Sequence, residues 1–391
     1  MNRFLQLHIL TSYPPANLNR DDLGRPKTAK MGGVDRLRVS SQSLKRHWRV
    51  SDLFQQALSG HLGDRTKLFG VDIFTHLIAK GQSFKDALAW AVQIAAQFGK
   101  PESPDDLKKK SEIEKAKLYA KLQLQWRAWD KEKLGIADYP LEQLNALIAV
   151  EISQLAFISP EERQAALSLA DRLASGEVTE LKKDLELLRD KTSAADVALF
   201  GRMLADSPSK NIEAACQVAH AISVHPVVIE DDYFTAVDDL NDGSVDAGAA
   251  HIGETGFAAG LFYSYVCINR EQLVANLGGD KELAAKALAA LTEAAVKVAP
   301  SGKQNSFGSR AYASYVLAES GDQQPRSLSV AYLKPIDQRS SADFAGDAIT
   351  ALKTQRDNFD RVYGACADTR CELDAVAGEG SLNELLAFVC E

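Results

Sequence analysis

The chain has 391 residues, of which 46% are hydrophobic and 25% charged, so it is long enough to bury more than one core. No apolar run approaches the roughly 20 residues that a membrane span needs. The N-terminus also lacks the apolar region of a signal peptide. The composition therefore predicts a soluble, cytoplasmic protein with no membrane partner.

The net charge of −8 is unevenly distributed. Residues 1–49 contain ten Lys or Arg against three Asp, a net of +7, so residues 50–391 carry −15. A dense basic block on an acidic body indicates a directed anion-binding face rather than a generally adhesive surface.

The chain begins with a predicted strand and a long loop. Residues 3–10 alternate between apolar and polar side chains, as a half-buried strand does. Residues 11–37 are rich in Pro, Gly, Asn and Asp and predict a loop. Ser40 or Ser41 is then placed to cap a helix that runs to about residue 57.

This first helix is expected to present a cationic ridge. Leu44 and Trp48 are four residues apart and should face the core, whereas Lys45 and Arg49, one position further round, should point outward with Arg46 beside them. The preceding loop adds further cations that can follow an extended polyanion: Arg20, Arg25, Lys27, Lys30, Arg36 and Arg38. The serines and the free N–H groups at the helix start supply directional donors to a phosphate oxygen.

The middle of the chain predicts a helical lobe. Residues 84–200 are almost entirely helical in pattern. Leu118, Leu122, Trp126 and Trp129 recur at helical spacing, which favours a packing stripe over a row of RNA-stacking side chains. An irregular region follows over roughly residues 201–256.

The C-terminal part returns to strands and helices. Residues 260–269 predict a strand, and a helix with Leu283, Leu288 and Leu291 on one side then ends before Pro300. Two further strands are expected at 310–317 and 328–333, followed by a helix over 340–363. The sum is an α+β core of ferredoxin-like or RRM-like type, interrupted by the helical lobe.

Familiar catalytic motifs are missing from the sequence. A Ser-x-x-Lys nucleophile would need Ser where Gln42 stands before Lys45, and no GxSxG, P-loop or HExxH occurs. His220 and His225 are five residues apart, a poor spacing for one helical metal site. The five cysteines are odd in number and include no CxxC pair, which favours buried thiols over disulfides or zinc. These observations indicate no cofactor or metal site, and the residues alone favour a polyanion-binding α+β protein over an enzyme.

The acidic run from Glu230 to Glu254 leaves two alternatives open. It contains eight carboxylates and no Lys or Arg. Paired carboxylates can hold Mg²⁺, so a metal-dependent nuclease with the basic block as its substrate track is one interpretation. The favoured alternative is a surface loop that docks on a basic partner.

Several stretches together resemble a known family. "LNRDDLGRPKTAKMGG" at residues 18–33 and "RVSSQSLKRHWR" at 38–49 are followed in order by "GRMLADSP" at 201–208 and "HIGETGFAAGLFYSYVCINREQLVANLGG" at 251–279. This set resembles the CasC-type backbone subunit of the type I-E CRISPR Cascade complex. The similarity covers most of the chain and fades in the helical lobe and after about residue 310.

The resemblance implies a non-catalytic protein that oligomerises along a CRISPR guide RNA, beside other Cascade subunits. The RNA would then be displayed for pairing with target DNA in antiviral defence. The implied fold is an RRM-like palm formed by residues 1–60 and 201–391, with a thumb-like loop insertion over about 230–260. Residues 61–200 would form a helical fingers domain.

The resemblance also assigns RNA-binding residues. Residues of the basic block would hold phosphates, and residues of the thumb, with one Met, would displace a nucleotide by stacking that tolerates any base. Some of the acids of the thumb are then expected to meet basic side chains of the next copy. The implied RNA-binding residues are Arg20, Lys27, Ser40, Gln42, Lys45, Arg46, Arg49, Met203, Tyr233, Phe234, Thr235 and Val237.

Overall fold

The chain folds into two compact units, described here from a computed structural model. Unit 1 comprises residues 1–59, 215–274 and 280–391, and unit 2 comprises residues 60–214 and 275–279. The structure describes residues 2–129, 139–178, 187–204, 207–236, 251–337 and 341–391. None of the helices within those residues is both long and apolar enough to span a bilayer.

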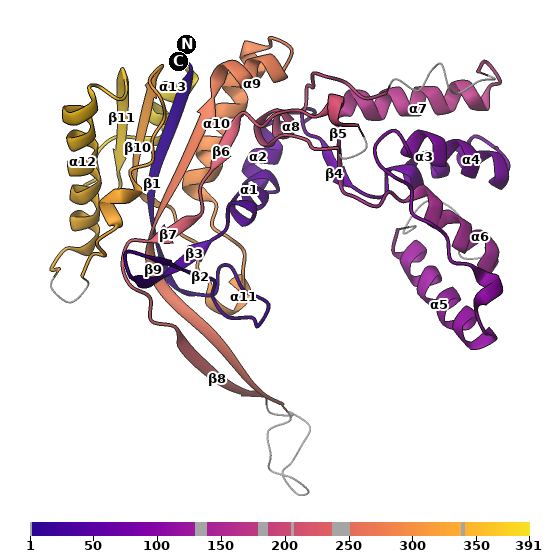
Figure 1. Ribbon diagram of the computed structural model, residues 1–391, viewed down its shortest axis with the longest axis horizontal. Coiled ribbons are helices and arrows are strands. Elements are labelled where there is room, and N and C mark those ends of the chain that lie inside the picture. Colours follow the sequence, from indigo (N-terminus) through magenta and orange to yellow (C-terminus); the bar gives the residue numbers. More distant parts are fainter. Residues whose placement is uncertain (1, 130–138, 179–186, 205–206, 237–250, 338–340) are drawn as a thin grey trace, which may run out of the picture. The chain divides into compact units, whose positions relative to one another are not determined.

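Unit 1 is built on an antiparallel sheet with the order β11-β10-β1-β9-β7-β3-β2, to which β6 and β8 are added through β9 (Figure 1). The α+β class predicted from the sequence is therefore confirmed. In chain order the strands are β1 (Phe4–Ala16), β2 (Thr28–Met31), β3 (Val34–Val39), β6 (Cys216–Val218), β7 (Ala221–Ser223), β8 (Glu230–Ala236), β9 (His251–Asn269), β10 (Ala313–Gly321) and β11 (Thr369–Asp374).

Helices cover both faces of this sheet. On one face, α12 packs Ile349 and Leu352 against Tyr315 and Leu317 of β10. Side chains in alternate positions along a strand point to opposite faces of the sheet, and Leu7 of β1 is buried on the second face. On that face α10 and α13 contact β10 and each other. The helices of unit 1 are α1 (Ser41–Arg49), α2 (Asp52–Ala57), α9 (Arg270–Asn276, which continues into unit 2), α10 (Lys281–Lys297), α11 (Gln304–Phe307), α12 (Phe344–Tyr363) and α13 (Leu382–Cys390), with the 3₁₀ turn η6 (Ser329–Tyr332).

The first strand is more deeply buried than its alternating sequence predicts. β1 pairs with β9 on one edge and β10 on the other, so it lies inside the sheet, and the side chains of residues 5–11 are buried on both faces. Gln6 and His8, expected on a wet face, are both buried. Polar residues at these positions therefore serve an internal network instead of solvent.

Two predicted irregular segments contain strands. The expected loop over 11–37 holds the end of β1 and the β2–β3 hairpin, whose turn is Gly32–Gly33 with φ of 64° and 79°. The expected irregular region over 201–256 holds β6, β7, β8 and the start of β9. Short strands paired with distant segments leave little periodicity in the sequence, which explains both errors.

Other predictions were confirmed or shifted. The helix expected through residue 57 is two helices, because Ser51 caps α2 after a break at Val50. The helices before Pro300 and over 340–363 are confirmed as α10 and α12. The strand expected at 310–317 is β10, shifted toward the C-terminus, whereas that expected at 328–333 is the turn η6.

Unit 2 is mainly helical, with a small two-stranded sheet. Trp126, Leu122 and Leu118 lie in its core, which confirms the packing interpretation of that stripe. The side chain of Trp129 lies outside the described residues. The elements are β4 (Asp64–Thr66), α3 (Phe69–Ala79), α4 (Phe84–Ala95), η1 (Leu107–Lys109), α5 (Glu112–Trp129), α6 (Leu141–Ala146), η3 (Leu147–Val150), β5 (Ala156–Ile158), α7 (Pro160–Ala174), α8 (Ala195–Phe200) and η5 (Pro208–Lys210).

Candidate nucleic-acid interface

Helix α1 begins with a side-chain cap. The hydroxyl oxygen of Ser40 accepts from the Ser43 N–H at 3.3 Å, which satisfies one unpaired donor of the first turn. The Ser40 N–H in turn donates to Oδ1 of Asn19 at 2.9 Å. The helix start is thus tied to the segment before β2. Leu44 and Trp48 are buried, as predicted, so the register of the helix on the core is fixed.

The polar positions of α1 lie at different depths. Gln42 and Arg46, four residues apart, are exposed, whereas Lys45 and Arg49 are half-buried at the edge of the packed face. Lys45 lies near enough to β6 to act on Cys216, whose pKa burial raises to about 12 in spite of that positive charge. Long cationic side chains can cover apolar surface with their stems and still reach solvent with their charged ends.

The segment between β1 and β2 is held in place by hydrogen bonds rather than being a free loop. The Asp21 carboxylate accepts from the N–H groups of Leu23 and Arg25, each at 2.9 Å. Arg20 forms an isolated β-bridge with Pro26, and the Lys27 N–H donates to the Asn19 carbonyl at 2.8 Å. Arg20 is exposed and Lys27 half-buried. Both are therefore presented by a fixed backbone.

Arg36 is a correction to the predicted polyanion track. Its side chain is fully buried and donates to the carbonyl oxygens of Met31, Ser223 and Tyr332. It therefore joins the β2–β3 hairpin to β7 and η6. The charge at this position serves the fold and does not meet a ligand.

Arg20 and α1 share a cleft of about 550 Å³ with a segment that sequence reasoning missed. His47 donates through Nδ1–H to the Ser43 carbonyl at 2.7 Å, so its Nε2 accepts from the Ser301 hydroxyl at 2.8 Å. The cleft is lined by Leu18, Asn19, Arg20, Asp21, Asp22, Gly24, Ser43, His47, Ser301, Gly302 and Lys303.

Lys303 adds a cation opposite α1. Its backbone is left-handed, with φ of 47°, and its Nζ donates to Thr255 Oγ1 at 2.7 Å. A Cβ at Gly302 would lie 2.4 Å from the Leu18 carbonyl oxygen, so only glycine fits this close approach. The Ser-Gly-Lys sequence just after Pro300 was the signal that could have identified this wall.

The region expected as a thumb is a two-stranded ribbon in its described part. β8 and the first half of β9 run together away from the rest of the sheet (Figure 1). Tyr233 is 63% exposed and Phe234 44%, and Thr235 is exposed. The Phe234 ring lies across Gly253 on the opposite strand, where a Cβ would meet it at 2.3 Å. Val237 lies outside the described residues.

One acid of this ribbon is paired within the chain. Asp231 accepts from Arg25 Nη2 at 3.0 Å. The β8–β9 ribbon thus begins beside the Arg25 segment. The expectation that some of the thumb acids meet the next copy stays a prediction. Among the described residues, no three His, Cys, Asp or Glu side chains are grouped to hold a metal ion.

Met203 lies in unit 2, although the sequence assigned residues 201–214 to the palm. It is 81% exposed, and its neighbours hold it firmly. Arg202 is buried and donates through Nη1 to both oxygens of Glu162 at 2.7 Å. The Leu204 N–H donates to Asn211 Oδ1 at 2.6 Å. The buried ion pair of Arg202 with Glu162 of α7 joins the segment around Met203 to the helical unit.

Comparisons with known proteins connect this geometry to a family. Residues 5–384 match the family model described as "CT1975-like protein". A solved chain titled "CRISPR RNA-guided surveillance complex, pre-nicking" is similar with a TM-score of 0.76 and 27% identity, covering 99% of this chain and 99% of that one. Another, titled "CRISPR RNA-guided surveillance complex", shares the fold with a TM-score of 0.55 and 23% identity, covering 99% and 98%.

No curated protein matches the chain. The family match nevertheless covers nearly the whole sequence, and the structural match spans both units. The chain therefore belongs to the CT1975-like protein family, the non-catalytic CasC-type backbone subunits of type I-E CRISPR Cascade surveillance complexes.

Proposed function

We propose that the chain grips the sugar-phosphate backbone of a guide RNA with the basic surface of unit 1, leaving the bases free to pair with target DNA. The observation that carries this proposal is the shared cleft in which Arg20, the first turns of α1 and Lys303 face one another. Arg20 and Lys303 line the cleft together with the carboxylates of Asp21 and Asp22, of which Asp21 is committed to the N–H groups of Leu23 and Arg25. Further cations, Lys45, Arg46 and Arg49, lie on α1. The spread of the cations over three segments favours a polyanion over a single phosphate.

We assign the phosphate contacts to side chains with different geometries. Arg46 and Gln42 stand exposed on α1. Ser40 is buried, and its hydroxyl oxygen accepts from the Ser43 N–H, so a contact with phosphate would use its O–H at the edge of the cap. Lys45 and Arg49 flank the packed face. The complete proposed set of phosphate contacts is Arg20, Lys27, Ser40, Gln42, Lys45, Arg46, Arg49 and Lys303.

The ribbon and the exposed methionine are proposed to contact bases. Tyr233, Thr235 and Met203 offer exposed surface, and Phe234 offers the part of its ring that does not cover Gly253. Such contacts displace a base without reading its identity. In this proposal unit 1 is the RRM-like palm with the β8–β9 ribbon as its thumb, and unit 2 is the fingers domain.

Charge reversal on α1 tests the proposal. The double variant Lys45→Glu, Arg49→Glu is expected to lose binding to a single-stranded guide RNA at moderate salt, measured by fluorescence anisotropy. The milder double variant Lys45→Ala, Arg49→Ala should make the negative slope of log K against log salt shallower by about 1.4. Each phosphate contact with a single strand contributes about 0.7 to the size of that slope, and two contacts are lost.

A matched control separates local contact from overall charge. Lys281→Glu with Lys286→Glu makes the same change on two exposed positions of α10, where Lys286 pairs with Glu282 across one helical turn. This control should retain most of its RNA affinity. Equal losses in the two double variants, or unchanged affinity in the α1 variant, would contradict the proposal.

We further propose that copies of the chain assemble along the RNA. A scaffold whose charges serve only subunit contacts would form oligomers by itself. Size-exclusion chromatography with and without guide RNA distinguishes the two, and RNA-dependent assembly is expected. The cytoplasmic location predicted from the sequence remains part of this proposal.

The alternative of a metal-dependent nuclease is not retained, because the family consists of non-catalytic subunits. The described carboxylates of the acidic run also have other surroundings: Asp231 meets Arg25, and Glu254 lies opposite Tyr233 across the ribbon.

A further inference from the structure

A second cavity in unit 1 plays no part in the phosphate contacts described above. Its volume is about 250 Å³, and it lies between η6 and the strands β7 and β9. Sites for drug-sized ligands usually measure about 300–1,000 Å³, so this cavity suits a single ring system. It is lined by Met31, Ala219, His220, Ile222, Ser223, Tyr263, Ser327, Ser329 and Tyr332.

Two aromatic rings contribute to the lining. The ring centroids of Tyr263 and Tyr332 are 5.4 Å apart, and both residues are buried. The Tyr263 oxygen accepts from the Leu328 N–H at 3.0 Å and donates to His8 Nδ1 at 2.8 Å, while the Tyr332 hydroxyl donates to the Ala348 carbonyl at 2.9 Å. Because both hydroxyls are committed internally, the rings offer the cavity mainly apolar surface.

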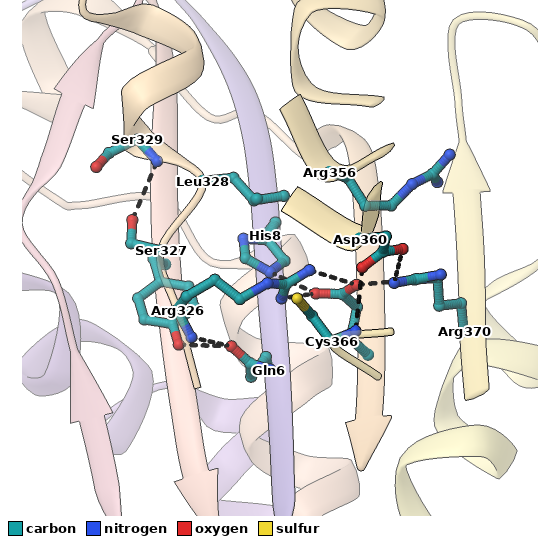
Figure 2. A network of polar contacts seen from close by, with 12 residues as sticks. Gln6, His8, Arg326, Ser327, Leu328, Ser329, Arg356, Asp360, Cys366 and Arg370 are labelled. Carbon is teal, nitrogen blue, oxygen red and sulfur yellow. Dashed lines mark hydrogen bonds and ion pairs between the residues drawn. The ribbon is translucent and has the colours of Figure 1, made fainter. Parts of the chain in front are cut away.

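The wall that contains Ser327 and Ser329 is fixed by a buried network (Figure 2). Arg326 donates to both carboxylate oxygens of Glu319, and its backbone N–H donates to Gln6 Oε1 at 2.9 Å. The Ser329 N–H donates to the Ser327 oxygen at 3.2 Å. Removing two charges from water costs free energy that their attraction often only offsets. We therefore read the pair of Arg326 and Glu319 as a contact that fixes the shape of this wall more than it stabilises the fold.

His220 lines the cavity, and the cationic side chains of Arg38 and Lys27 lie near it. Arg38 Nη1 donates to His220 Nδ1 at 3.0 Å, and because a guanidinium has no acceptor, the ring proton must be on Nε2. Desolvation of part of the ring, with the nearby charges of Arg38 and Lys27, also lowers the pKa of His220. The ring therefore keeps an N–H donor, with positive charge close by.

We propose that this cavity receives one nucleobase of the bound RNA while the adjoining phosphates pass Lys27 and Arg38. The proposal rests on the RNA binding proposed above and adds a base-binding site to it. A neighbouring protein's aromatic side chain would also fit the cavity, but the cations beside it favour a ligand that carries phosphate. Ring surface accepts any base, so occupancy should not depend on sequence.

Photo-crosslinking of the full-length protein tests this assignment. A single-stranded RNA of guide length with 4-thiouridine substituted throughout is expected to crosslink to peptides containing residues 219–223 or 327–332, as identified by mass spectrometry. Ser329→Phe should fill the cavity, remove these crosslinks and weaken RNA binding about tenfold, within the range for losing one stacked base. Ser59→Phe, at an exposed position after α2, is the matched control and should leave both unchanged.

The outcomes separate this inference from the proposed function. Normal RNA affinity with crosslinks confined to the α1 region would overturn the base site and leave the phosphate grip intact. Normal affinity combined with loss of RNA-dependent assembly in Ser329→Phe would assign the cavity to a neighbouring protein and also overturn the base site. If the wild-type chain binds no RNA, both proposals fail.

Discussion

At the scale of single residues, the most unusual feature is the buried pair His8 and Glu319, both 0% exposed and 3.1 Å apart. Burial lowers the pKa of His8, against the pull of the neighbouring carboxylate. Burial by itself would raise the pKa of Glu319, but hydrogen bonds from His8 and Arg326 outweigh it and hold that pKa well below its usual value. The native state thus favours neutral His8 and ionised Glu319.

Both shifts make unit 1 less stable in acid. The unfolded chain binds more protons than the native chain below about pH 6.5 at His8 and below about pH 4.5 at Glu319, so stability falls as the pH falls. Replacing His8 with Gln, which can also accept from Tyr263 and donate to Glu319, should flatten the dependence between pH 5 and 6.5. The expected difference is at most about 1.4 kcal/mol per pH unit, measured by urea unfolding. Parallel pH profiles of wild type and His8→Gln would contradict this account.

At the scale of elements, helix caps organise the basic surface. Ser40 caps α1 and Ser51 caps α2, each accepting from an N–H three residues on at 3.3 Å. Neither helix is long enough to be stable alone, so caps and packing define where the first turn lies. The position of the α1 start then determines where Gln42 and Arg46 emerge.

Comparing the two caps tests the dual role of Ser40. Ser40→Ala and Ser51→Ala should each cost about 1 kcal/mol of stability, measured by chemical denaturation. Only Ser40→Ala should also weaken RNA binding, by roughly 2- to 12-fold, the effect of losing one hydrogen bond. If both variants lower RNA affinity equally, Ser40 acts only through the fold.

At the scale of the whole molecule, each of the two units has a hydrophobic core of its own. Unit 1 packs helices on an antiparallel sheet, whereas unit 2 gathers its helices around a cluster that includes Phe74 and Trp126. Met203 is presented by unit 2, through the buried pair of Arg202 and Glu162. The proposed RNA contacts therefore depend on the stability of both units.

Removing one member of that pair should weaken unit 2 selectively. Arg202→Met leaves a buried carboxylate without its main partner, at an expected cost of about 3–5 kcal/mol. Lys210→Met, which breaks the exposed pair with Asp190, should cost less than about 1 kcal/mol. Hydrogen exchange should accelerate in peptides of unit 2 in the first variant only. Unchanged exchange there would show that the pair contributes little.

The sequence alone was sufficient for features whose causes are local. A serine at 40 or 41 before an amphipathic stretch predicts where α1 starts, and Leu44 with Trp48 predicts its buried face, because capping and periodicity act within a few residues. The structure then shows that Ser40 is the cap. The long helices α10 and α12 followed from the same rules. The clustering of cations before residue 50, and the ordered motifs that resemble the CasC-type family, likewise needed no coordinates.

Tertiary structure alone decided which of these residues are available to a ligand. Arg36 and Arg38 are two residues apart in one basic run, yet Arg36 is buried against three carbonyl groups while Arg38 reaches His220. Lys303 joins Arg20 in a cleft although 282 positions separate them in the sequence. Burial and long-range pairing arise from strands that meet across hundreds of residues, and no local pattern encodes which distant segment will cover a given charge.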